Sequence, residues 1–260
     1  MKQLLMIILF SIISTLSFAQ EITKDSIIEP YQIDKKYLSG LDIPKVKVKA
    51  HPKREYYQKR LYNGSELSVY ILSSETVTNE INNFPIDEFV YYINGRADIQ
   101  TKDSTSINFY SGDYFFVPKG FSGNWTNNGA NKLHLELSVV STKRADSTKT
   151  SKVQIPFLLD RELMSGIGVT QSDDSKKQES IVHSGVELEI LVEVSTKKEI
   201  NKNEKEEFIH VLIGSLTIQP ENGEIQTYYK GDFFIIPKGF IGTWENRGQE
   251  PVRVLKVFQI

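Results

Sequence analysis

A fourteen-residue stretch occurs twice in this chain, as GDYFFVPKGFSGNW at 112–125 and as GDFFIIPKGFIGTW at 231–244. Aligning residues 88–129 with 207–248 needs no gap, and 17 of the 42 aligned pairs are identical. The likeness continues upstream, where YQIDKKYLSGL at 31–41 parallels FLLDRELMSGI at 157–167. Each unit spans about 105 to 110 residues, which is the size of a domain and too large for a solenoid repeat. The chain is therefore predicted to fold as two copies of one domain.

The flanking segments set the predicted boundaries. Residues 1–19 have a short positive start, an apolar stretch and a small-x-small ending at Ala19, as in a signal peptide. Residues 20–30 are expected to form an N-terminal arm, 31–140 the first domain and 157–260 the second. Between the domains lies a linker, 141–156, which begins with the polar stretch STKRADSTKTSK.

Short strands dominate both units. Runs such as LSVYIL, EFVYYI, VELEILVEV and VRVLKVF are rich in β-branched and aromatic residues, and turn residues separate them. No long segment shows the 3.6-residue apolar period of an amphipathic helix. Many short strands at regular spacing predict an all-β antiparallel sandwich or barrel.

The doubled motif resembles the second conserved motif of the cupins, G-x5-P-x-G-x2-H-x3-N. The glycine, proline and second glycine stand at Gly112, Pro118 and Gly120, and again at Gly231, Pro237 and Gly239. The first cupin motif ends in E-x6-G, which is matched from Glu88 and from Glu207. The G-x-W ending is most similar to cupin domains of the ureidoglycine aminohydrolase type. This resemblance implies two tandem jelly-roll barrels (double-stranded β-helices), a bicupin.

Backbone geometry explains most letters of the motif. Glycine followed by Asp113 or Asp232 makes a tight turn into a strand, because glycine accepts positive φ and aspartate caps its own turn. Proline then ends the pairing of that strand. The recurring Lys119 and Lys238 sit at the following turn and are expected to be exposed. A wholly structural motif is therefore one interpretation.

The metal ligands that the resemblance implies are absent. Metal-binding cupins are similar in using three His and one Glu, but the motif-two His positions are Gly123 and Gly242 here. The stretches just before Glu88 and Glu207 contain no His either. One carboxylate per barrel cannot form a usual transition-metal site, which needs three or four protein ligands, so no metal and no cofactor are predicted. A carboxylate-and-amide site for a hard cation stays open.

Strand parity places the candidate ligand-binding residues. Trp125 and Trp244 lie two residues beyond the vacant ligand positions and share their inward face, where each indole either fills the core or forms the floor of a pocket. Glu88 and Tyr92 in the first unit, and Glu207 in the second, would line the same pockets. His210 stands three residues after Glu207 and is expected to face away from it. His51, His134 and His183 are expected to be isolated structural or surface residues.

Composition narrows the environment and the partners. The chain has no cysteine, and its formal charge of −2 is made of interspersed positive and negative residues, which argues against nucleic acid or an anionic membrane as partner. We expect export to the periplasm or the medium, with cleavage after Ala19 and no membrane insertion of the mature chain. Both a monomer and a homodimer are compatible with the sequence.

Three functions fit these observations. The favoured one is an exported bicupin that binds a sugar, a ureide or an organic acid in a barrel. The second is an enzyme, either similar to ureidoglycine aminohydrolase or a metal-free isomerase that pairs a His base with a Tyr or carboxylate acid. The third is a structural protein whose barrels serve dimerisation. One fold hosts many functions, so the site has to decide among them.

Overall fold

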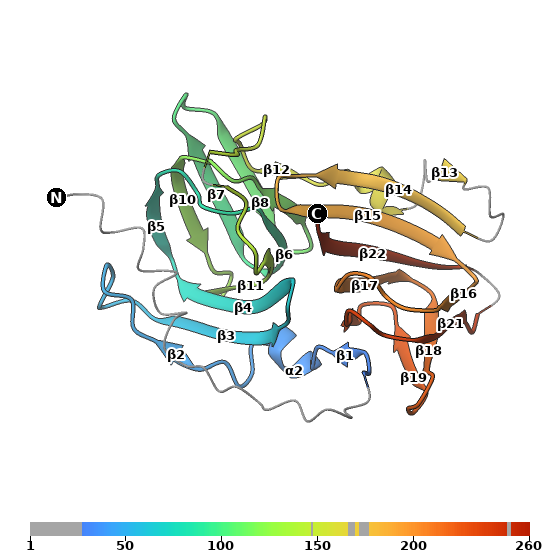
Figure 1. Cartoon of the computed structure of the whole chain (residues 1–260). Coiled ribbons are helices and arrows are strands. Elements are labelled where there is room, and N and C mark those ends of the chain that lie inside the picture. The colour runs from blue at the N-terminus through green and yellow to red at the C-terminus, as the bar shows by residue number, and fades with distance from the viewer. Residues whose placement is uncertain (1–27, 147, 166–169, 172–176, 249–250) are drawn as a thin grey trace.

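The computed structural model describes residues 28–146, 148–165, 170–171, 177–248 and 251–260, and the predicted signal peptide lies outside them. Two antiparallel barrels lie side by side, each made of a seven-stranded and a four-stranded sheet (Figure 1). This confirms the predicted all-β bicupin. Within the part of the chain that the structure describes, no helix is long and apolar enough to span a membrane.

Barrel 1 is built mainly from the first repeat. Its large sheet has the strand order β12 (Phe157–Leu158), β9 (Tyr114–Val117), β6 (Glu88–Asn94), β11 (Leu133–Ser141), β4 (Leu67–Glu75), β3 (Tyr56–Asn63), β2 (Lys45–Val46). Its small sheet has the order β5 (Val77–Ile81), β10 (Gly123–Asn128), β7 (Arg96–Thr101), β8 (Ser106–Tyr110).

Barrel 2 repeats this plan with the second unit. Its large sheet has the order β1 (Tyr31–Gln32), β20 (Phe233–Ile236), β17 (Glu207–Ile213), β22 (Val252–Gln259), β15 (Leu188–Ser195), β14 (Lys177–Ser184), β13 (Thr170–Gln171). Its small sheet has the order β16 (Lys197–Ile200), β21 (Gly242–Asn246), β18 (Ser215–Pro220), β19 (Gln226–Tyr229).

The duplicated lead-in segments cross to the opposite barrels. Strand β1 from the start of the first unit pairs with β20, and β12 from the start of the second pairs with β9. A short helix follows each crossing strand, α2 (Lys35–Leu38) after β1 and α3 (Arg161–Ser165) after β12. Each lead-in thus supplies an edge strand that the other barrel lacks, and the two units interlock.

Alternation along the strands divides the apolar residues into separate cores. On β6, Phe89 packs in a cluster between the barrels, whereas Val90 and Tyr92 pack inside barrel 1. On β17, Phe208 likewise joins the cluster between the barrels, and Ile209 joins the core of barrel 2. The outer faces of the two large sheets therefore bury each other, which leaves the lumen of each barrel as a separate interior.

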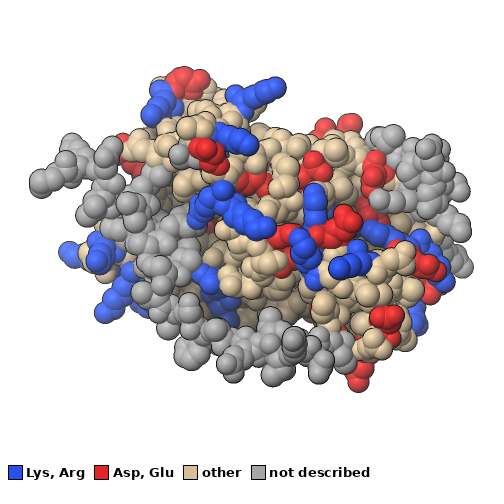
Figure 2. Space-filling model, viewed as in Figure 1, with Lys and Arg blue, Asp and Glu red and all other residues tan. Residues whose placement is uncertain are grey.

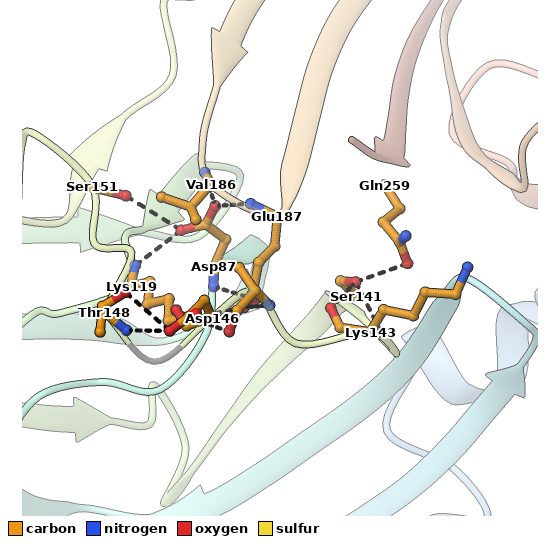
Figure 3. Close-up of polar contacts among 11 residues, drawn as sticks. Asp87, Lys119, Ser141, Lys143, Asp146, Thr148, Ser151, Val186, Glu187 and Gln259 are labelled. Carbon is orange, nitrogen blue, oxygen red and sulfur yellow. Dashed lines mark hydrogen bonds and ion pairs between the residues drawn. The ribbon is translucent and has the colours of Figure 1, made fainter.

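A buried polar clasp links the barrels and corrects one prediction, because Lys119 is 5% exposed and not a surface residue. Its Nζ donates to Oε1 of Glu187 at 3.2 Å and to the linker carbonyl of Ala145 at 2.8 Å. One carboxylate oxygen of Asp87 accepts the Lys119 backbone N–H at 2.9 Å, and the other accepts the Glu187 backbone N–H at 2.7 Å (Figure 3). Residues of both barrels and of the linker are thereby held together.

The same clasp recurs at the equivalent residues of the other repeat. Glu206 accepts backbone N–H groups from Ser65 at 2.7 Å and from Leu67 at 2.9 Å, and its own N–H donates to Glu66 at 2.9 Å. Lys238 completes it by donating to Oε1 of Glu66 at 2.6 Å, but the Lys238 side chain is 52% exposed, as predicted. The clasp explains why a lysine recurs in the doubled motif.

Candidate functional site

The opening of the doubled motif forms the predicted turn. Gly112 and Gly231 both have φ of +90°, a conformation that favours glycine. Oδ2 of Asp113 accepts the backbone N–H of Tyr110 at 2.8 Å, and Oδ2 of Asp232 accepts that of Tyr229 at 2.7 Å. Strands β9 and β20 end directly before Pro118 and Pro237.

The second oxygen of each motif aspartate binds the lead-in segment of the other unit. Arg161 forms an ion pair with Oδ1 of Asp113, and Lys35 lies 2.7 Å from Oδ1 of Asp232. The aspartates are buried, whereas the two cationic side chains are exposed. Besides capping its own turn, each aspartate therefore anchors the crossing segment.

The glycines at the vacant ligand positions are required by close packing. A Cβ at Gly123 would lie 2.5 Å from the carbonyl oxygen of Gln100 and 3.1 Å from Cζ of Phe121. At Gly242 it would meet the corresponding groups of Gln219 and Phe240. The sequence left open whether the indole fills the core here or forms the floor of a pocket, and the side-chain atoms nearest to the added Cβ belong to the phenylalanine. The indole of Trp125 packs at an angle of 70° to the Phe121 ring, 6.3 Å away.

The lumen of barrel 1 brings together the residues predicted for it. Tyr92 and Trp125 share its apolar cluster, and both donate to Oδ1 of Asn127, at 3.0 Å from the Tyr92 hydroxyl and 2.7 Å from the indole nitrogen. Glu88 lies on the same face of β6, two positions before Val90. Its Oε1 accepts a hydrogen bond from the hydroxyl of Ser138.

Strand β11 adds three polar residues to this lumen, of which only His134 had been considered from the sequence, as an isolated residue. His134, Glu136 and Ser138 alternate along the strand and pair with Ser74, Tyr92 and Val90 across the sheet. The alternation H-x-E-x-S was the signal that could have identified them, because period two places all three on one face.

His134 is buried beside Glu136. Its Nδ1 lies 3.0 Å from the backbone nitrogen and 3.1 Å from the carbonyl oxygen of Ser74, so it either accepts the Ser74 N–H, which leaves the proton of the neutral ring on Nε2, or donates to the carbonyl. Nε2 lies 3.8 Å from Oε1 of Glu136, and the ring stacks on Tyr92 with centroids 5.8 Å apart. Nε2 of His134 and Oε2 of Glu136 are both buried without a hydrogen-bond partner among the described residues. The expectation that His134 stands alone was therefore wrong.

The environment of Glu88 favours its protonated form. Burial raises the pKa of Glu88 to about 8, the carboxyl of Glu136 adds to the rise, and the Ser138 hydroxyl opposes it. Within the described chain, neither carboxyl forms an ion pair with a lysine or arginine. Barrel 1 thus contains two neighbouring carboxyl groups without an internal cation.

Barrel 2 differs at the corresponding place. Nζ of Lys256 lies 2.8 Å from Oε2 of Glu193 and 3.1 Å from Oε2 of Glu207, and only 2% of the Lys256 side chain is exposed. Burial lowers the pKa of Lys256, but the two carboxylates outweigh this and raise it above its usual range. Lys198 also reaches Oε2 of Glu193, at 3.3 Å, and burial together with Lys256 lowers the pKa of Lys198 to about 8.

Glu207 and Trp244, predicted for this lumen, both lie close to the ammonium group of Lys256. Its Nζ is 5.4 Å from the centre of the Trp244 ring, and Trp244 is fully buried. The prediction of a single carboxylate in each barrel was incomplete, because Glu193 and Glu136 enter from strands outside the motifs. In barrel 2 the carboxylates are neutralised by the protein itself.

His210 faces away from Glu207, as strand parity predicted. Its Nδ1 lies 3.0 Å from the Tyr114 hydroxyl, and its ring stacks on Phe233 in the space between the barrels. Burial lowers the pKa of His210 to about 3. Among the described residues, no group of three or more His, Cys, Asp or Glu side chains could hold a metal ion.

Comparison with known proteins agrees with this architecture. A family model described as a EutQ-like cupin domain matches residues 69–130 and 190–257, one match in each barrel. A search of curated proteins by sequence found no match.

Solved structures share the fold over most of the chain. A protein of unknown function from Pseudomonas syringae pv. tomato has a TM-score of 0.61 and 14% identity, over 88% of this chain and 98% of that one. A Cupin 2 conserved barrel domain protein from Leptotrichia buccalis has a TM-score of 0.57 and 12% identity, over 92% and 99%. A salicylate 1,2-dioxygenase from Pseudoaminobacter salicylatoxidans has a TM-score of 0.57 and 11% identity, over 91% and 86%. At such identities the likeness concerns the fold alone.

Proposed function

The chain belongs to the EutQ-like cupin domain family, and we propose that it is a binding protein that holds a small molecule in the lumen of barrel 1. Barrel 2, whose lumen contains the side chain of Lys256, has a structural role in this proposal. The main support is that a lysine neutralises the lumen carboxylates of barrel 2, whereas no lysine or arginine of the described chain pairs with Glu88 or Glu136 in barrel 1.

Unsatisfied polar groups in barrel 1 support a ligand. A buried polar atom without a hydrogen bond costs about 1–3 kcal/mol, and Nε2 of His134 and Oε2 of Glu136 are two such atoms in the lumen of barrel 1 within the described chain. Nε1 of Trp244 is another in barrel 2, but that lumen already contains the Lys256 ammonium group. The aromatic side chains of Tyr92 and Trp125 supply the apolar wall that small-molecule pockets have. A bound molecule with both donor and acceptor groups would satisfy the orphaned atoms.

The surface supports a small ligand more than a nucleic acid. On the face drawn in Figure 2, lysine and arginine are interspersed with aspartate and glutamate. Nucleic-acid binding surfaces gather positive charge along a continuous patch.

An acid–base enzyme, such as a metal-free isomerase, is the second candidate. The closeness of His134, Tyr92 and Glu136 favours it over an enzyme similar to ureidoglycine aminohydrolase. An isomerase needs a base with a lone pair directed at the substrate. In the tautomer in which Nδ1 of His134 accepts the Ser74 N–H, Nε2 carries the proton and offers the lumen a hydrogen-bond donor. In the tautomer in which Nδ1 donates to the Ser74 carbonyl, Nε2 offers a lone pair. The first tautomer suits a binding site and the second an acid–base enzyme.

We also propose that the protein acts outside the cytoplasm, on the strength of the apolar N-terminal stretch that ends at Ala19. Sequencing the N-terminus of protein recovered from the periplasm or the medium tests this, and the expected first residue is Gln20. Recovery of the chain beginning at Met1 in the cytoplasm would refute it.

Tryptophan fluorescence tests the binding proposal, since each barrel contains one tryptophan. The variant W244F reports on barrel 1 alone and W125F on barrel 2 alone. We expect sugars, ureides, organic amines and organic acids to include compounds that change the emission of W244F and leave W125F unaffected. The proposal fails if no compound of any charge affects Trp125, or if only Trp244 responds. Mass spectrometry of the same mixtures would detect turnover and thereby favour the enzyme.

A further inference from the structure

The duplication supplies an internal comparison between a lumen that contains a lysine side chain and one that does not. In barrel 2 an ammonium group, Nζ of Lys256, lies within 3.1 Å of two carboxylates and faces an indole ring. Ammonium–carboxylate contacts of this length are charge-assisted hydrogen bonds. Barrel 2 therefore shows how this kind of lumen accommodates a cationic nitrogen.

Strand register identifies the matching position in barrel 1. Glu207 pairs with Phe258 on β22, and Glu88 pairs with Val140 on β11. Two residues earlier on each strand stand Lys256 and Ser138, so Ser138 takes the place of the lysine. Barrel 1 keeps the motif glutamate and the tryptophan but replaces the long cationic side chain with a hydroxymethyl group.

The second carboxylate of barrel 1 comes from a different strand than in barrel 2. In barrel 2, Glu193 on β15 pairs with Val254 on β22. In barrel 1 the residue that matches Glu193 is Leu72 on β4, which pairs with Glu136 on β11. Glu136 itself occupies the position of Val254 and supplies a carboxylate from the neighbouring strand. Its charge acts on Glu88, which places the two groups in one electrostatic environment.

We propose that the ligand of barrel 1 carries a cationic nitrogen, as an ammonium or a guanidinium group, and that Glu88 and Glu136 bind it as Glu207 and Glu193 bind Lys256. The inference rests on the proposed binding function and narrows its ligand class. The second observation is His134, whose side chain is 3% exposed and whose Nε2 is directed toward Glu136 without a hydrogen-bond partner among the described residues. An acceptor atom beside the cationic group of the ligand would satisfy it.

This arrangement disfavours the organic acids that the sequence left open. A ligand carboxylate would be a further negative charge beside Glu88 and Glu136, and like charges in a poorly hydrated site repel strongly. A metal ion is disfavoured too, since the described residues offer no group of three ligands. An organic cation adds no negative charge beside Glu88 and Glu136 and does not need three metal-ligating side chains.

The pH dependence of binding follows from Glu88. The other charged or titratable side chains described on this face of the sheet are Tyr92, His134, Glu136 and Arg60. Arg60 lies over the ring of Tyr70, with its guanidinium carbon 5.4 Å from the ring centre. Because the pKa of Glu88 is raised to about 8, a guanidinium ligand would displace its proton below that pH. Its Kd is expected to fall by up to about tenfold per pH unit between pH 6 and 8.

Replacing Ser138 tests the inference without knowledge of the ligand. The variant S138K would supply the cation internally, as Lys256 does, and S138M is its neutral control of similar length. We expect S138K to have a higher Tm than S138M at pH 8. An S138K protein that is no more stable than S138M would overturn the proposed cation site.

Binding of matched probes provides the second arm. We expect benzylammonium to bind W244F at least tenfold more tightly than benzyl alcohol or benzoate, and to bind W244F/E88Q and W244F/E136Q at least tenfold more weakly than W244F. If a neutral or anionic compound binds best and these substitutions have no effect, the binding function stands and the cationic ligand is refuted. If no compound binds and S138K gains no stability over S138M, both proposals fail.

Discussion

Removing the Lys119 ammonium is expected to weaken the protein far more than removing its counterpart, Lys238. The two lysines occupy the same place in the doubled motif and contact equivalent glutamates. Only 6% of the Lys119 side chain and 1% of Glu187 are exposed, whereas 52% of Lys238 is exposed. K119M and K238M are therefore matched substitutions that differ mainly in the burial of the ion pair.

The magnitude follows from what each substitution leaves behind. K119M leaves the Glu187 carboxylate buried between the barrels without its cation, although the backbone N–H groups of Asp87 and Ala145 still donate to it. Breaking a buried ion pair on one side costs about 3–5 kcal/mol, and the remaining donors place the expected loss near the lower end of that range. Water replaces the exposed Lys238 ammonium at little cost.

Urea unfolding followed by circular dichroism would measure both free energies of unfolding at pH 7. The double variant K119M/E187Q serves as a further control, and it should recover part of the loss because no buried charge remains. Equal losses in K119M and K238M, or no recovery in K119M/E187Q, would show that burial of the Lys119–Glu187 pair is not what stabilises this contact.

Two further substitutions test the interior of barrel 1. The pKa of Glu88 is raised from 4.5 to about 8 on folding, so the folded protein holds a proton that the unfolded chain has released. The free energy of unfolding should therefore fall as the pH rises through this window, by at most about 5 kcal/mol, and E88Q should remove the decline. An equal decline in both proteins between pH 5 and 8.5 would contradict this prediction. G123A would force a Cβ against the Gln100 carbonyl and Phe121, and we expect it to lower the free energy of unfolding by about 1–3 kcal/mol. N124A, at the exposed neighbouring position, should lower it little. Similar Tm values for the two variants in thermal unfolding would refute the packing argument.

Some of the site was predictable because strand parity is local. The face of β6 that carries Glu88 and Tyr92 follows from period two, and so does the outward direction of His210. The same rule applied to β11 groups His134, Glu136 and Ser138, but that strand lies outside the motifs, and the prediction treated His134 as isolated. The alternation of polar residues on β11 is the sequence signal of the second carboxyl group.

The lysines could not be predicted in this way. Local sequence predicts that Lys119 is exposed, because it lies at a turn between proline and glycine. Its burial depends on Glu187, a residue of the other barrel, and on a linker carbonyl. Likewise, the composition of β22 does not reveal that Lys256 meets Glu193 and Glu207, because these residues come from three strands.

Local sequence features are sufficient to predict the two barrels and their turns, and they show that the usual cupin histidines are absent from the motifs. Those features depend on the offset of the repeats and on backbone preferences of glycine and proline, which act within a few residues. Packing of the whole chain places each lead-in strand in the opposite barrel. It also gives Glu193 and Glu207 of barrel 2, but not Glu88 and Glu136 of barrel 1, a lysine partner among the described residues. Charge pairing and burial depend on which strands become neighbours, and that is set by register and packing across the whole chain.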